Sequence, residues 1–374
     1  MPVVAAGLVA AMLPVFLLGT LSPRIGAELG LSEAGVGLAL SIFFTAAALS
    51  AVPGGRVADR IGAGAALRFG VLAAAAAMAG VGLAVTGTAG LLVLLVGAGA
   101  ALGLVDPGGS RALSAAVPLR RQGLAFGVKE ASVPTASLLA GASLPLVVGW
   151  RASFVAGGVL AALIAAAVPR GLDASRARSH PRPPASSGTP AAAVFAVAAA
   201  SALGGGAAVV GVTFLVPAAL DRGWSEPAAG GLLVTASLTG IAVRLAVGLL
   251  ADRRPGAERT LLAVALLLGA VGLAGLGTGP LLTAALLAVG AGWGWTGLAF
   301  LAAVRLDPDR PARAAGMVLT GLAIGGAIGP AGFGWIVTRA GFPRAWLLAA
   351  AAMAAAALLI GVAAHRARQA GDPG

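Results

Sequence analysis

Apolar runs long enough to cross a lipid bilayer follow one another along almost the whole of the 374-residue chain. A helix rises 1.5 Å per residue, so about 20 apolar residues span a hydrocarbon core of about 30 Å. Helices are expected because lipid offers the backbone no hydrogen-bond partners, and a helix pairs its own N–H and C=O groups. Charged residues make up only 10% of the chain, against about 25% in a soluble protein. The sequence therefore predicts an all-α membrane protein with twelve transmembrane helices, at residues 2–22, 33–53, 66–86, 89–115, 123–147, 152–169, 191–217, 228–250, 259–277, 280–304, 314–337 and 343–363.

A short charged loop occurs twice, at a spacing close to half the chain length. Its first copy runs from Gly55 to Arg60 and its second from Gly248 to Arg253, each between two apolar runs. Two other loops match counterparts in the second half, in the same order: residues 31–35 with 224–228, and residues 149–154 with 341–346. We infer that the chain is a duplication of a six-helix unit.

The duplication predicts two pseudo-symmetric six-helix bundles, residues 1–169 and 191–374, the second ending in a short cytoplasmic tail. Residues 170–190 are rich in arginine, proline and serine and are expected to form a flexible cytoplasmic linker. Arginine is concentrated in the loops on the linker side, which places that side and both termini in the cytoplasm. We therefore expect a multi-pass protein of a bacterial cytoplasmic membrane. Because no basic tract is interleaved with aromatic residues, no nucleic-acid partner is expected, despite the net charge of +12.

Both copies of the charged loop resemble a signature of the major facilitator superfamily, roughly Gly-x-x-x-Asp-Arg-x-Gly followed by a basic pair. The loop at residues 117–123 also resembles its counterpart in that family. The matching residues are Gly55, Asp59, Arg60 and Gly62 in the first copy, and Gly248, Asp252 and Arg253 in the second. Together with the twelve runs and the repeat, the resemblance implies a secondary transporter that works by alternating access between two bundles.

In that family the first loop is thought to latch the cytoplasmic side while the transporter faces outward. The resemblance implies this role here: Gly55 would let its helix approach a neighbour closely, and Asp59 would accept hydrogen bonds at a helix N-terminus across the bundle interface. The alternative is a turn that only sets the topology. In the second copy Arg254 and Pro255 break the pattern. The first copy is therefore expected to be the latch and the second mainly to record the ancestry.

The sequence departs from the drug exporters of the family in two of its helices. Their fourth helix usually carries an arginine shortly before a glycine pair, whereas residues 93–99 contain none. Their Gly-Pro motif is missing from residues 123–147, and a similar string occurs instead at residues 325–330. These departures favour an organic anion or metabolite as the substrate, with drug/proton efflux as the alternative.

Four charged residues lie inside two neighbouring apolar runs: Asp106 and Arg111 in one, Lys129 and Glu130 in the next. A charge at the centre of a membrane helix costs about 2.5–3.5 kcal/mol, so each needs a partner. An Arg111–Glu130 pair is geometrically reasonable. One interpretation is that Asp106 or Glu130 exchanges a proton while Lys129 or Arg111 meets an anionic substrate. The other is a buried ion-pair network that only fixes the two helices together.

Three further residues are candidates for the substrate site. Arg244 lies within the run at 228–250, where some organic-anion carriers of the resembled family bind a carboxylate; the alternative is a scaffold for the following loop. Trp293 and Trp295 lie in the middle of the run at 280–304, away from the bilayer interface where tryptophan is common. Residues two apart on a helix point about 200° apart, so at most one indole faces a cavity squarely, and packing between helices is the alternative.

The sequence contains few of the side chains that membrane enzymes use for catalysis. The chain contains no cysteine and two histidines, and these, His180 and His365, fall in the linker and the tail. No phosphate-binding Gly-x-x-x-x-Gly-Lys loop occurs. We therefore expect no catalytic residues, cofactor or metal, with a membrane enzyme, a sensor and a channel as the rival classes. The expected partners are a small-molecule substrate, protons and the lipid bilayer, and the chain is expected to act as a monomer.

Overall fold

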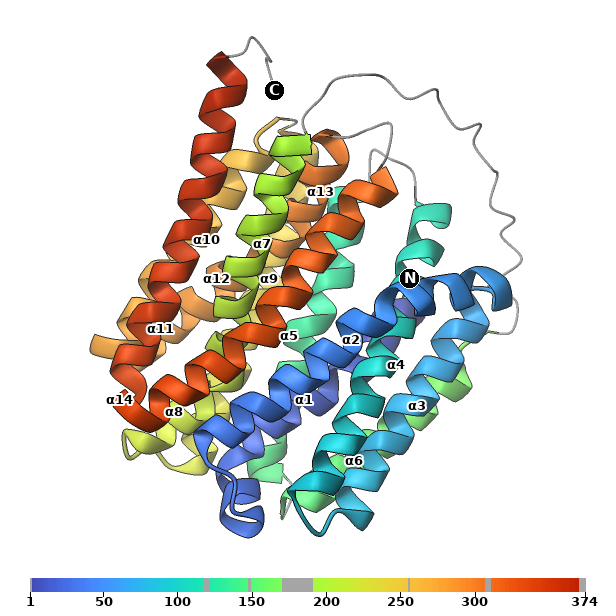
Figure 1. Cartoon of the computed structure of the whole chain (residues 1–374), viewed down its shortest axis with the longest axis vertical. Helices are drawn as coiled ribbons and strands as arrows, with labels where there is room; N and C mark the ends of the chain where they lie inside the picture. The colour runs from blue at the N-terminus through green and yellow to red at the C-terminus, as the bar shows by residue number, and fades with distance from the viewer. Residues whose placement is uncertain are drawn as a thin grey trace.

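A computed structural model describes residues 2–117, 122–146, 149–169, 191–254, 256–306 and 311–369. The predicted linker at 170–190 lies outside these residues. Six helices make up the first half (Figure 1): α1 (Pro2–Leu29), α2 (Glu33–Ile61), α3 (Ala63–Ala84), α4 (Thr88–Ala116), α5 (Gln122–Leu146) and α6 (Trp150–Ala167). Every apolar run predicted in this half is a helix, so the all-α fold class is confirmed.

The second half is also helical but less regular. It comprises α7 (Ala191–Thr213), α8 (Leu215–Asp221), α9 (Glu226–Arg253), α10 (Glu258–Thr278), α11 (Leu281–Ala285), the π-helix η3 (Leu286–Ala291), α12 (Gly292–Gly294), α13 (Thr296–Leu306) and α14 (Pro311–Gln369). The predicted run at 280–304 is therefore one broken helix made of four short elements. In contrast, α14 joins two predicted runs, and Gly341 inside it has a non-helical φ of 78°.

The predicted count of twelve membrane-spanning helices is confirmed only in part. Ten of the described helices are long and apolar enough to cross a membrane, if 281–303 is taken as one and the long Met317–Ala363 span as one. That last span contains the break at Gly341 and so holds two of the predicted runs. The helix α5 is not among the ten; it carries Lys129 and Glu130.

Loops that match in sequence also match in local structure. Ser32 and Ser225 occupy the same place in the two halves, and each caps a long helix. The Ser32 hydroxyl accepts from the N–H of Gly35 at 3.2 Å, and the Ser225 hydroxyl accepts from the N–H of Ala228 at 3.4 Å. Such caps satisfy N–H groups that have no partner within the helix.

The second matched pair of loops depends on glycine. Gly149 and Gly341 have φ values of 93° and 78°, a region that side chains with a Cβ rarely adopt. Gly149 comes before α6 and Gly341 before the second part of α14, and the first turns after each glycine carry a buried tryptophan, Trp150 and Trp346. The two halves therefore repeat the same turn as well as the same sequence.

Each half has its own packing, and the two halves meet along two seams. In the first half α3 packs against α4 and α6, and α1 packs against α4, α5 and α6; in the second half α14 packs against α7 and α10. One seam pairs α5 with α9, and the other pairs α2 with α14 (Figure 1). Below, the end of the molecule where α6 ends and α7 begins is called the linker end, and the other the far end.

The α5–α9 seam is tight at both ends because glycines face each other there. A Cβ on Gly248 would lie 2.9 Å from the carbonyl oxygen of Gly123 near the linker end. Near the far end, a Cβ on Gly230 would lie 2.7 Å from the carbonyl oxygen of Gly141. Such close backbone approach is how membrane helices gain van der Waals contact. The seam is thus closed along its length.

The α2–α14 seam is closed mainly towards the far end. There a Cβ on Gly37 would collide with the carbonyl of Pro330, and the Ala331 N–H donates to the Ser41 hydroxyl at 3.0 Å. Closer to the linker end, Ala47 and Ala51 of α2 instead line a cavity. The two seams therefore differ: one is shut throughout, and the other parts towards the linker end.

Candidate functional site

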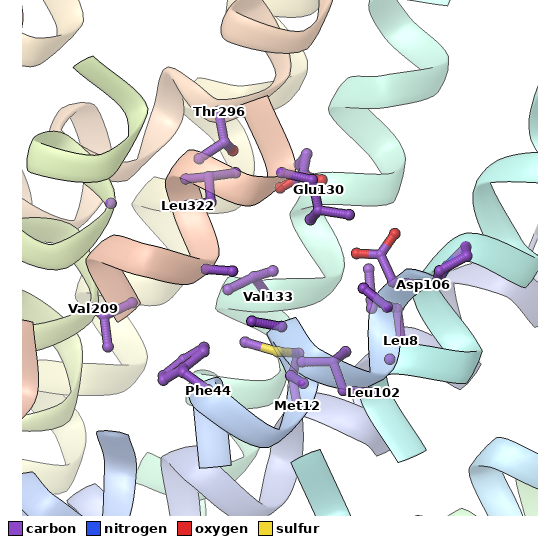
Figure 2. Close-up of a pocket in the computed structure, with 18 of the residues that line it drawn as sticks. Leu8, Met12, Phe44, Leu102, Asp106, Glu130, Val133, Val209, Thr296 and Leu322 are labelled. Carbon is purple, nitrogen blue, oxygen red and sulfur yellow. The ribbon is translucent and has the colours of Figure 1, made fainter. Parts of the chain in front are cut away.

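A cavity lies at the junction of the two halves and encloses about 850 Å³ of empty space, its mouth included. This volume is in the usual range for small-molecule sites. Its wall is mostly apolar and draws on both halves: Leu8 and Met12 of α1, Phe44, Ala47, Ala48 and Ala51 of α2, Leu102, Gly103, Asp106 and Pro107 of α4, Glu130 and Val133 of α5, Gly205 and Val209 of α7, Trp293 of α12, Thr296 and Phe300 of α13, and Leu319, Leu322 and Ala323 of α14. Figure 2 shows the carboxylates of Asp106 and Glu130 on this wall, opposite Phe44 and Val209.

A buried lysine joins the two carboxylates of the wall. The Nζ atom of Lys129 lies 2.8 Å from Oδ1 of Asp106 and 3.5 Å from Oε1 of Glu130. Lys129 is 3% exposed and is not among the residues that line the cavity. It also lies 5.5 Å from the ring centre of Phe300, on the other half. Both α4 and α5 pack against α1, and the long lysine side chain bridges them.

The structure describes the side chains of three of the four charged residues that the sequence analysis singled out in these two helices. Asp106, Lys129 and Glu130 lie together, and the closest ion pair is Lys129–Asp106. The side chain of Arg111 lies outside the described residues, so the suggested Arg111–Glu130 pair stays a prediction. Because Asp106 and Glu130 face the cavity and Lys129 lies behind them, a proton or a ligand in the cavity meets the carboxylates first.

Arg244 is a buried arginine on α9 whose guanidinium finds no hydrogen-bond partner in the described part of the chain. It is 2% exposed, and among the described residues none of its three guanidinium nitrogens has a hydrogen-bond partner. Its Cζ lies 5.5 Å from the ring centre of Trp293. Its Nη1 lies 3.6 Å from where a Cβ on Gly240 would be, and that Cβ would lie 3.5 Å from Pro134 of α5. The guanidinium is therefore beside α5, one turn from Glu130.

Arg244 is not among the residues lining the large cavity. It lines a smaller pocket of about 260 Å³ with Gly123 and Gly127 of α5, Val247 and Gly248 of α9, and Gly294, Gly297, Leu298 and Leu301 of α12 and α13. Trp293 lines the large cavity and contacts Arg244. The indole therefore lies between the guanidinium and the cavity.

The two mid-helix tryptophans have different surroundings. Trp293 contributes to the cavity wall and packs edge-on against Phe16 of α1, with ring centres 5.8 Å apart. Trp295 is 1% exposed, its indole N–H donates to the carbonyl of Gly292 at 2.8 Å, and it is not among the lining residues. One of the two faces the cavity and the other packs within its bundle.

The second copy of the charged loop contacts the other half. Asp252 accepts hydrogen bonds from the N–H groups of Gly123 at 3.2 Å and Leu124 at 3.0 Å, at the N-terminus of α5. A carboxylate there satisfies unpaired N–H groups and interacts favourably with the helix dipole. Gly248 is part of the same close approach, whereas Arg253 is exposed. The second copy thus makes two hydrogen bonds to the other half, and the interpretation that it mainly records the ancestry stays a prediction.

The first copy is described in less detail. Gly62 has a φ of 89° and caps α2, and Arg60 is exposed. The side chain of Asp59 lies outside the described residues, so its latch role stays a prediction. A Cβ on Gly55 would make only ordinary contact with Pro107, at 3.7 Å, whereas one on Gly54 would collide with the carbonyl of Gly103. The close approach of α2 to α4 is therefore at Gly54, one residue before the motif glycine.

Polar contacts at the far end were not anticipated from the sequence. Arg24 of α1 forms a two-pronged ion pair with Glu226 of α9 and so joins the two halves. Within the first half, Glu28 accepts from Trp150 at 2.6 Å and from Arg151 at 2.7 Å. The partners are far apart along the chain, so sequence spacing contains no signal of either contact. The far end is thus closed by side chains from both halves.

Comparison with known proteins agrees with this architecture. The model of the Major Facilitator Superfamily matches residues 4–304. The crystal structure of the human organic anion transporter MFSD10 (TETRAN) superimposes with a TM-score of 0.69 at 18% identity, over 96% of this chain and 98% of that one. Comparison with curated proteins gives no match.

A second solved structure is a bacterial homolog of the human lysosomal transporter Spinster, in an inward-facing and occupied conformation. It superimposes with a TM-score of 0.68 at 16% identity, over 97% of this chain and 94% of that one. At such identities the two structures show a shared fold and no more. With the family model covering most of the chain, this protein belongs to the Major Facilitator Superfamily of membrane transporters.

Proposed function

We propose that the protein is a secondary transporter that carries an amphipathic organic anion together with a proton. The observation that supports this most is the pair of buried cations next to the cavity, Lys129 and Arg244, which both interact with the charge of Glu130. A buried cation that lacks partners is costly, by several kcal/mol. Arg244 has no hydrogen-bond partner among the described residues. An anion delivered by the substrate would supply one.

The apolar wall indicates the rest of the substrate. Small and aliphatic side chains surround most of the cavity, with Phe44, Trp293 and Phe300 as its aromatic members. Such a wall binds a hydrophobic body through area removed from water. The few polar groups would fix its orientation. A compound with one acidic group and a hydrophobic body fits both features, and MFSD10, which shares the fold, is described as an organic anion transporter.

Glu130 provides a way to couple the anion to a proton. When ionised it lies 3.5 Å from Lys129, and its charge also acts on Arg244. It therefore competes with a substrate anion for the same cations. A proton on Glu130, or on Asp106 beside it, removes that competition. Asp106, Glu130, Lys129 and Arg244 together carry no net charge, so one proton entering with one monoanion keeps this balance.

The closed far end and the parted α2–α14 seam support an alternating-access cycle. The arginine-rich loops favour a cytoplasmic position for the linker end, and with that orientation this conformation would face inward. In the opposite state the Arg24–Glu226 pair would break and α2 would close onto α14 near the linker end. One chain encloses the whole cavity, so a monomer would suffice.

The test uses three probes of equal chain length and different charge: octanesulfonate, octanamide and octyltrimethylammonium. Each is added to proteoliposomes that contain a trapped pH indicator, with protein-free liposomes as the control. The proposal predicts that octanesulfonate acidifies the lumen only when the protein is present, because the anion enters with a proton. A proton response to the cation alone, or no response to any probe, would contradict it.

A second candidate, exchange of a hydrophobic cation for protons, is favoured by one observation. The charged side chains among the described lining residues are both carboxylates, Asp106 and Glu130. A lipophilic cation could neutralise them when they are ionised. The same assay separates this candidate, because entry of octyltrimethylammonium in exchange for protons would make the lumen more alkaline.

A further inference from the structure

Trp293 separates a buried arginine from the cavity it would serve. The indole lines the large cavity, and the guanidinium of Arg244 lies 5.5 Å from its ring centre without lining that cavity. On its other side the ring contacts Phe16 of α1, the helix that supplies Leu8 and Met12 to the wall. A substrate anion in the cavity of Figure 2 therefore meets the indole before it meets the arginine.

The indole also gives the guanidinium a favourable contact. The face of an aromatic ring attracts a cation, and the attraction is strongest when water is excluded. Arg244 is 2% exposed and has no hydrogen-bond partner among the described residues, so the ring of Trp293 is a favourable contact for it, in addition to the charge of Glu130. Charge-assisted hydrogen bonds to an oxyanion are stronger and can be two-pronged for arginine. An anion would therefore replace the ring once both can reach the guanidinium.

The backbone around Trp293 is suited to such a movement. The residue lies in the three-residue helix α12, between the π-helix Leu286–Ala291 and the turn at Trp295. Glycines flank it at 292 and 294. π-Helical segments break the regular hydrogen-bond register and often occur at functional sites. Trp295, in contrast, is held by its hydrogen bond to the Gly292 carbonyl.

We propose that Trp293 is a shutter over Arg244, which covers the guanidinium in the empty carrier and moves aside when the anionic group of the substrate binds. The movement of the ring rests on the proposed function, because its ligand is the transported anion. The covering of Arg244 by Trp293 does not depend on that function. It gives Trp293 a role in specificity: a small anion without a hydrophobic body gains too little from the apolar wall to displace the ring. A substrate that fills the cavity does so.

The experiment measures how fast phenylglyoxal modifies Arg244 in the purified full-length protein. Mass spectrometry of the peptide that contains Arg244 gives the rate. We compare wild type with Trp293→Leu, which removes the ring face, and Trp293→Phe, which keeps a smaller one. Trp295→Leu is the matched control, because that indole is buried in the same segment and contributes nothing to the cavity wall.

The shutter predicts that Trp293→Leu accelerates modification by about fivefold or more, the factor expected when a desolvated cation–π contact is lost. Trp293→Phe should give an intermediate rate, and Trp295→Leu the wild-type rate. Equal rates in wild type and Trp293→Leu would overturn the shutter. So would an equal acceleration in Trp295→Leu, which would indicate general loosening of the segment.

Adding octanesulfonate separates the shutter from the proposed function. If both hold, the probe slows modification of Arg244 in Trp293→Leu because the sulfonate occupies the guanidinium. Acetate should also slow modification in Trp293→Leu. Its protection, expressed as a fraction of the protection by octanesulfonate, should be larger in Trp293→Leu than in wild type. If Trp293→Leu is modified faster but octanesulfonate gives no protection, Trp293 covers Arg244 but anion binding at Arg244 is wrong, and with it the movement of the ring.

Discussion

Lys129 and its two carboxylate neighbours form the charged centre of this protein at the scale of single residues. Its Nζ atom has one short contact, to Asp106, and a longer one, to Glu130. The sequence could predict that charges this deep need partners, but not which pair would form. That choice depends on how α4 and α5 rotate against α1, which is decided by packing along their whole length.

Removing Asp106 tests the importance of the short ion pair. Asp106→Leu removes the closer of the two carboxylates that pair with the buried Lys129, and breaking a buried pair from one side costs about 3–5 kcal/mol. We expect a clearly lower thermal unfolding temperature in detergent. The double variant Asp106→Leu with Lys129→Met removes both charges and should recover most of the stability without recovering transport. An unchanged unfolding temperature in the single variant would show that the pair contributes little.

Glu130 should make anion binding depend on pH. When ionised it competes with the substrate anion for Lys129 and Arg244, so binding of octanesulfonate should weaken as pH rises. Glu130→Gln resembles the protonated form, so its affinity should be high and nearly independent of pH. Ligand-induced thermal stabilisation across a pH series measures both. A wild type whose affinity does not change with pH would remove Glu130 from the coupling.

At the scale of elements, the α5–α9 and α2–α14 seams behave differently in this conformation. The first is closed by facing glycines at both ends and by the Asp252 cap on α5. The second is tight towards the far end and lines the cavity nearer the linker. We therefore expect α5 and α9 to act as the hinge and α2 and α14 to carry out most of the opening.

Cross-links test this division, and a chain without cysteine is well suited to them. The hydroxyls of Ser137 and Ser237 lie 2.7 Å apart in the middle of the α5–α9 seam. Oxidised Ser137→Cys/Ser237→Cys should still transport, because the hinge stays closed. Oxidised Ser41→Cys/Ala331→Cys should not, because it holds the α2–α14 seam shut towards the far end. Full transport by the second cross-linked variant would contradict the assignment.

Asp252 should stabilise the closed α5–α9 seam. Losing a helix cap typically costs about 0.5–2 kcal/mol, so Asp252→Ala should lower the thermal unfolding temperature of the protein. Arg253→Ala is the control, because that side chain is exposed. Thermal unfolding of the two variants and of wild type in detergent measures the loss. Equal unfolding temperatures for Asp252→Ala and Arg253→Ala would show that the cap is energetically neutral.

Most of these helices could be located from the sequence, but not which of their faces and residues contact one another. Matched loops with Ser32 and Ser225 predicted the repeat correctly, because capping is local chemistry. The close approach at Gly54 was missed in favour of Gly55, because one residue turns a helix face by about 100° and the motif does not indicate the angle. The Arg24–Glu226 pair could not be predicted, because it depends on which state the two halves adopt.

At the scale of the whole molecule, two similar halves enclose one cavity with an unequal set of charges. The first half contributes Asp106, Lys129 and Glu130, and the second contributes Arg244 and the Trp293 that covers it. The duplication thus accounts for the two similar bundles, and the sequence differences between the halves account for the charged residues beside the cavity. Coupling between an anion and a proton would follow from bringing the two sets of charges together.

The most direct test is accumulation of octanesulfonate in proteoliposomes under an imposed proton gradient, acid outside. Its sulfonate stays ionised, so the probe does not cross lipid as a neutral acid. One proton carried with each anion predicts accumulation of about tenfold per pH unit, abolished by a proton uncoupler and absent in Glu130→Gln. Equal concentrations of octanesulfonate on both sides, with the gradient intact, would contradict the account.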